Sequence, residues 1–151
     1  MTEFDPRALL VALDAAGGRF VVIGGMAVAA HGFIRATEDL DLVPEPSPAN
    51  LAAIGNVLVG LDATLPTSGG RQFASRDLAP GVNVTLATSL GGVDVVQRAP
   101  GLPAYRELDE VAAPTDIDGV AVRVCSLAHL RAMKRAAGRP IDVADLDALP
   151  E

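Results

Sequence analysis

Hydrophobic positions in the first third of the chain follow two different periods. Apolar residues at helical spacing after Asp5-Pro6 predict a helix that ends near Gly17, since Asp is a good N-cap and Pro suits the first turn. The unbroken apolar run 20–23 predicts a strand buried on both faces. Two glycines then lead into a short predicted helix over residues 26–31. Helices and strands therefore alternate from the start.

Residues 38–43 have a period of two, which predicts a strand with one face on the core. Leu40 and Leu42 occupy that face, so Asp39 and Asp41 share the other one. The remaining pattern predicts helices, strands and irregular segments in this order: helix 48–61, loop 67–80, a hairpin of 82–86 with 93–96, an irregular or briefly helical segment 100–114, strand 120–124, helix 126–137 capped by Ser126, and helix 142–149 capped by Asp142.

This order of elements predicts an α/β (α+β) fold in which helices flank a mixed β-sheet. The length of 151 residues fits a single domain over residues 1–151. The longest apolar run, residues 20–30, is too short for a membrane span, and the N-terminal residues have no signal-peptide pattern. A single cysteine excludes an intramolecular disulfide. We therefore expect a cytoplasmic protein that does not enter a membrane.

The net charge of −7 and the low aromatic content disfavour a protein that binds nucleic acid over a broad surface. The chemistry-bearing residues are instead acidic. Asp39 and Asp41, two residues apart on one strand face, can converge on a Mg²⁺ ion, although an exposed edge-strand pair is the alternative. Asp94 lies among valines and needs a cation or a hydrogen-bond partner if it is buried; otherwise it faces outward.

Four further residues fit the binding of phosphate. Side-chain-free backbone at Gly24-Gly25 lets an anion approach free N–H groups, while a tight turn with close helix packing is the alternative. Lys134 falls on the apolar stripe of its helix and needs an anion: a nucleotide phosphate or a sheet carboxylate, unless its stem reaches water. Arg35 can reach a phosphate or neutralise Asp39.

Three other positions have simpler readings. We expect His31 to act as a cap or to form a hydrogen bond, and Cys125 to be a small buried apolar residue. Arg139 and Asp142 either pair with each other or contact a substrate.

The run 22–42, VIGGMAVAAHGFIRATEDLDL, resembles the signature of the nucleotidyltransferase superfamily, which has a polymerase-β-like fold. It is most similar to the small bacterial branch that includes abortive-infection-type toxins and minimal nucleotidyltransferases. The run 133–146, MKRAAGRPIDVADL, resembles the closing lysine and R-x-x-D motif of that branch. Together with Asp94, these similarities span residues 20–148.

The resemblance implies a role for each matching residue. It makes Gly24-Gly25 the triphosphate-binding turn and places Lys134 and Arg35 near the nucleotide. The serine that many members carry after the first glycine is Gly25 here, and a frequent lysine is Ile141. The implied metal ligands and catalytic residues are Asp39, Asp41 and Asp94, with Asp94 nearest the acceptor hydroxyl.

We therefore expect a Mg²⁺-dependent nucleotidyltransferase that transfers a nucleoside monophosphate from a nucleoside triphosphate to an acceptor hydroxyl. The resemblance implies acceptors such as a tRNA end, a protein or a small molecule, and a place in a toxin–antitoxin system. A partner protein or a homodimer is expected because the chain has little room for an acceptor-binding domain. The alternative is a catalytically inactive binding partner, or antitoxin-like module, that keeps the fold.

Overall fold

The computed structural model describes residues 3–151, which form one eight-stranded sheet and six α-helices. The strand order across the sheet is β4-β3-β5-β6-β2-β1-β8-β7. The strands are β1 Phe20–Ile23, β2 Asp39–Pro44, β3 Thr64–Leu65, β4 Arg71–Gln72, β5 Val84–Thr88, β6 Gly91–Val95, β7 Ala113–Ile117 and β8 Val120–Val124. The helices are α1 Pro6–Ala15, α2 Gly24–Ala30, α3 Pro48–Gly60, α4 Tyr105–Glu110, α5 Leu127–Ala137 and α6 Pro140–Ala148, with short 3₁₀ turns at Pro66–Ser68 and Ser75–Asp77.

Local sequence accounts for the start of α1 and for both ends of α5. The side chain of Asp5 accepts a hydrogen bond from the backbone N–H of Ala8 and so caps α1. Ser126 caps α5 in the same way through His129, and Gly138 ends that helix with a left-handed backbone. The predicted caps of these two helices are confirmed.

The sheet is mixed. β1 pairs antiparallel with β2 and parallel with β8, and β2 pairs parallel with β6. β5 and β6 form the predicted hairpin. The α+β fold class with a mixed sheet and flanking helices is therefore confirmed.

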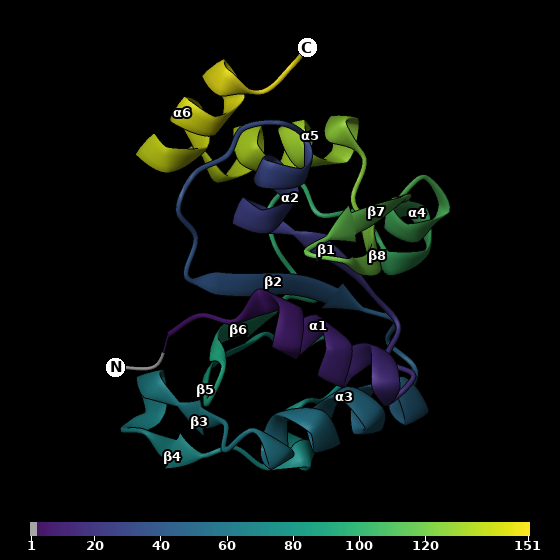
Figure 1. Ribbon diagram of the computed structural model, residues 1–151, viewed down its shortest axis with the longest axis vertical. Helices are drawn as coiled ribbons and strands as arrows, with labels where there is room; N and C mark the ends of the chain where they lie inside the picture. The colour runs from purple at the N-terminus through teal and green to yellow at the C-terminus, as the bar shows by residue number, and fades with distance from the viewer. Residues whose placement is uncertain (1–2) are drawn as a thin grey trace.

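Figure 1 shows α2, α5 and α6 above β2 and the helices α1 and α3 below it. β1 is buried along its whole length, as its unbroken apolar run predicts. In β2, Leu40 and Leu42 are fully buried while Asp39 and Asp41 are not, and the two aspartates share the opposite face of the strand. None of the helices formed by residues 3–151 is long and apolar enough to cross a membrane.

Several predicted boundaries were wrong. α2 begins at Gly24 rather than at residue 26, because Ile23 already occupies the cap position. Asp142 is the third residue of α6 rather than its cap; its side chain accepts a hydrogen bond from the backbone N–H of Arg139. The strands β3, β4 and β7 were missed, since two are too short to show a period and the third contains Pro114, which is tolerated at a sheet edge.

Candidate functional site

Asp41 and Asp94 lie side by side on neighbouring parallel strands. They are direct register partners between β2 and β6, and both line one cavity. Burial, the charge of Asp94 and a hydrogen bond with Asp94 raise the pKa of Asp41 to about 7, while the ammonium of Lys134 acts in the opposite direction. The Oδ1 atom of Asp41 is buried and has no hydrogen-bond partner. An unpartnered carboxylate oxygen beside a second carboxyl group is a donor set suited to a cation.

Asp39 lies one strand repeat away from this pair. Its register partner is Gly92, and a Cβ at Gly92 would overlap the Asp39 carboxylate, so that carboxylate rests against β6 outside the cavity lining. Burial, followed by the charges of Asp94 and Glu38, raises the pKa of Asp39. Over residues 3–151, no three His, Cys, Asp or Glu side chains stand together as a metal-binding group. The structure thus brings two of the three expected carboxylates into one cavity.

Gly24 and Gly25 fit closely beneath neighbouring side chains. Gly24 has a positive φ of 69°, and a Cβ there would overlap the carboxylate of Asp41. A Cβ at Gly25 would lie 2.9 Å from the hydroxyl oxygen of Thr37. The tight packing that was the alternative reading of these glycines is therefore present, and it places the start of α2 directly against Asp41.

Lys134 is buried on the opposite wall of the same cavity, with only 7% of its side chain exposed. Its Nζ atom lies 2.9 Å from Asp145 Oδ2 and 3.2 Å from Asp142 Oδ1. Both carboxylates are buried and come from α6. A sheet carboxylate was one expected partner of Lys134, but its ion-pair partners are two aspartates of the next helix, α6.

Two arginines complete this group of charges. Arg35 donates two hydrogen bonds to Asp145, at 2.8 and 3.0 Å, so it contacts neither Asp39 nor the cavity. Arg139 donates to Asp142 at 2.7 Å, which shows the pairing alternative, and its exposed side chain also borders the cavity. Although burial opposes the effect, hydrogen bonds from Arg139 and Lys134 lower the pKa of Asp142 to about 2. We call these five residues (Arg35, Lys134, Arg139, Asp142 and Asp145) the helical charge cluster.

The cavity between the sheet aspartates and the helical charge cluster has a volume of about 270 Å³. Sequence reasoning missed Asp145, although its spacing of three from Asp142 places both on one helix face. It also missed Thr85, because the register that sets it opposite Asp94 depends on the hairpin pairing. The other lining residues are Ile23, Gly24, Asn83, Val84, Val95, Val96, Ala99, Pro100, Leu130, Met133 and Ala137.

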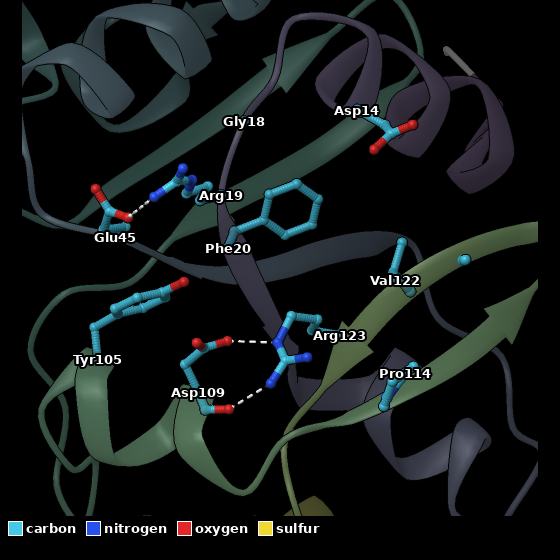
Figure 2. Close-up of a pocket in the computed structure, with 11 residues that line it drawn as sticks. Asp14, Gly18, Arg19, Phe20, Glu45, Tyr105, Asp109, Pro114, Val122 and Arg123 are labelled. Carbon is cyan, nitrogen blue, oxygen red and sulfur yellow. Dashed lines mark hydrogen bonds and ion pairs between the residues drawn. The ribbon is translucent and has the colours of Figure 1, made fainter.

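A larger cavity of about 680 Å³ lies at the other end of β1 (Figure 2). Figure 2 shows Tyr105 and Phe20 between two ion pairs. One joins Arg19 to Glu45 at 3.1 Å, and the other joins Arg123 to Asp109. Each of the two guanidiniums there already pairs with an acid, and Asp14 adds a third acid to the lining, so this larger cavity is poorly suited to an anionic ligand.

Two smaller expectations are confirmed. The ring Nε2 of His31 lies 2.8 Å from the carbonyl oxygen of Cys125, so His31 forms a hydrogen bond at the end of α2. Cys125 is fully buried, and burial raises the pKa of its thiol to about 12, which makes it an inert core residue.

The fold and site define an α+β protein whose cavity sets an acidic pair on the sheet against a basic group on two helices. Comparison with known protein families and with curated proteins gives no match for this chain.

Proposed function

We propose that the chain is a Mg²⁺-dependent nucleotidyltransferase that moves a nucleoside monophosphate from a nucleoside triphosphate to an acceptor hydroxyl. The observation that carries this proposal is the Asp41–Asp94 pair, with its unpartnered Oδ1 atom, in the same cavity as Lys134. The resemblance of residues 22–42 and 133–146 to nucleotidyltransferases supports the same conclusion.

The donor set fits a magnesium ion. Mg²⁺ binds through one or two protein carboxylates and completes its shell with water and phosphate oxygens, which agrees with two aspartates at this cavity. Asp41 and Asp94 would hold the ion, and the resemblance implies Asp39, on the same strand face, as a third ligand. When bound, the ion would neutralise charge on the triphosphate.

The charge balance of the helical charge cluster suits a phosphate. Its three cations face two carboxylates, which leaves one net positive charge. Lys134 has three N–H donors, of which two are taken by Asp142 and Asp145, so one remains for a phosphate oxygen. Arg139, exposed at the cavity edge, supplies a second group that a triphosphate can reach.

Asp94 is the carboxylate placed to accept a proton from the acceptor hydroxyl. It lies on β6, between β2 and the hairpin strand β5, and so stands on the side of Asp41 that faces away from α2. Leu130, Met133 and Ala137 give one wall of the cavity an apolar lining. We propose a tRNA end, a protein or a small molecule as acceptor, and a partner protein as an element of a toxin–antitoxin pair.

Calorimetric titration with each nucleoside triphosphate, with and without Mg²⁺, tests the proposal. We expect Mg²⁺-dependent binding that is lost in Asp41→Asn and Asp94→Asn and kept in Asp14→Asn, a matched control at the larger cavity. Labelled triphosphates with tRNA or protein acceptors then separate an enzyme from an antitoxin-like binding module: binding without transfer to any acceptor would support the module. Absence of Mg²⁺-dependent binding in the unmodified protein would contradict the proposal.

A further inference from the structure

Thr85 is the hydroxyl-bearing residue nearest to Asp94 in the sheet. The two are direct register partners in the antiparallel β5–β6 pair, so their side chains project from the same face. Thr85 is exposed and lines the same cavity as Asp94. Among residues 3–151, no hydrogen bond engages its hydroxyl, and no other cavity-lining residue carries one.

The order of strands places Thr85 and Asp41 on opposite sides of Asp94. Gly24 packs against Asp41, and the charge of Lys134 acts on Asp41, so the groups suited to the triphosphate lie on the β2 and β1 side. Thr85 lies on β5, on the opposite side of β6. The carboxylate of Asp94 therefore stands between the nucleotide groups and one free hydroxyl of the chain itself.

We propose that Thr85 is a site of self-modification, at which the protein transfers a nucleoside monophosphate to its own side chain. This inference rests on the proposed function. The Thr85 oxygen forms a bond to the α-phosphorus, the bond from that phosphorus to the bridging α–β oxygen breaks, and pyrophosphate leaves. The hydroxyl proton passes to Asp94. A phosphodiester at Thr85 fills the acceptor side of the cavity and so stops transfer to other acceptors.

The test begins with purified protein incubated with Mg²⁺ and each of the four nucleoside triphosphates. Intact mass and peptide mapping should show one added nucleoside monophosphate, located at Thr85. Thr85→Val should lower the adduct at least tenfold, while Thr85→Ser, which restores a hydroxyl, should recover it. Thr115→Val, on the edge strand β7 outside the cavity, serves as the control and should match the unmodified protein. Because the step is intramolecular, its first-order rate constant should not change with protein concentration.

The same experiment separates the two proposals. If the protein binds a triphosphate with Mg²⁺ but carries no adduct, carries it at another residue, or is modified at a rate constant that rises with protein concentration, self-modification at Thr85 is overturned. Transfer to a tRNA, protein or small-molecule acceptor then decides the proposed function separately. If no triphosphate binds in the presence of Mg²⁺, both fail. Equal melting temperatures of the Thr85 variants would show that a lost adduct is not a folding defect.

Discussion

A cavity lies at each end of β1, and the two cavities differ in how their charged side chains are arranged. At the Phe20 end, two guanidiniums each pair with one acid around the larger cavity, and Asp14 is a third acid in its lining. At the Ile23 end, acids collect on the sheet and a net positive cluster collects on the helices, with the smaller cavity between them. Separated and partly buried charge, rather than volume, marks the end of the sheet where a charged ligand would be stabilised.

The two regions also differ in energetic terms. Exposed ion pairs contribute little because water already solvates both partners. Buried charges at the Ile23 end depend on each other, since a buried ion without its partner costs several kcal/mol. Changes at the two ends should therefore have very different sizes, and the following predictions test that difference.

The largest effect is expected at Asp145, which is almost fully buried and binds both Arg35 and Lys134. Asp145→Asn keeps the volume but leaves two cations short of an anion. We expect the free energy of unfolding to fall by about 3–5 kcal/mol. Urea denaturation measures it; a loss below about 1 kcal/mol would show that water compensates these cations.

A somewhat smaller effect concerns the chemistry of the acidic pair. Asp41→Asn and Asp94→Asn each remove one carboxylate of the cavity, and we expect the proposed nucleotidyl transfer to fall by roughly 100-fold or more, which corresponds to about 2.7 kcal/mol of transition-state stabilisation. The rate of pyrophosphate release is the measurement. Asp14→Asn, beside the larger cavity, is the matched control and should retain the full rate.

Sequence periodicity predicted the elements that carry the acidic pair, because the buried strand Phe20–Ile23 and the alternating strand with Leu40 and Leu42 have clear patterns. The same alternation placed Asp39 and Asp41 on one face. It could not predict that the Asp39 carboxylate turns toward Gly92, since that depends on strand pairing. Composition and spacing likewise could not show that α6 folds back over α5, so the partners of Lys134 and Arg35 came only from the structure.

The pH dependence of stability should reveal the same pair in the absence of metal. The pKa of Asp41 is raised from its ordinary 3.8 to about 7, so the folded state favours the protonated form. That stabilisation is fully present below about pH 4 and is lost as the pH rises through about 7. Asp41→Asn should therefore match the unmodified protein near pH 4 and be the more stable of the two near pH 8.

Added Mg²⁺ provides the control for this pH effect. The ion should stabilise the unmodified protein at about pH 8, because it binds the folded carboxylates, and should have little effect on Asp41→Asn. Thermal melting across this pH range, with EDTA or Mg²⁺, measures both. If the unfolding free energies of the two proteins do not diverge as the pH rises, ionisation of Asp41 costs the folded protein nothing even without a cation.

The smallest effect is expected at Asp109, which pairs with Arg123 beside the larger cavity. Both side chains are about one-third exposed or more, at 34% and 43%, so solvent screens their attraction. The guanidinium of Arg123 also donates to the carbonyl oxygen of Asp109 itself, a contact that Asp109→Asn leaves in place. We expect this substitution to lower the free energy of unfolding by less than about 1 kcal/mol, and by less still in high salt. Urea denaturation at low and high ionic strength, beside Asp145→Asn, is the measurement. A loss as large as that of Asp145→Asn would mean that the charges at both ends of β1 are equally important for folding, and the contrast between the two cavities would no longer hold.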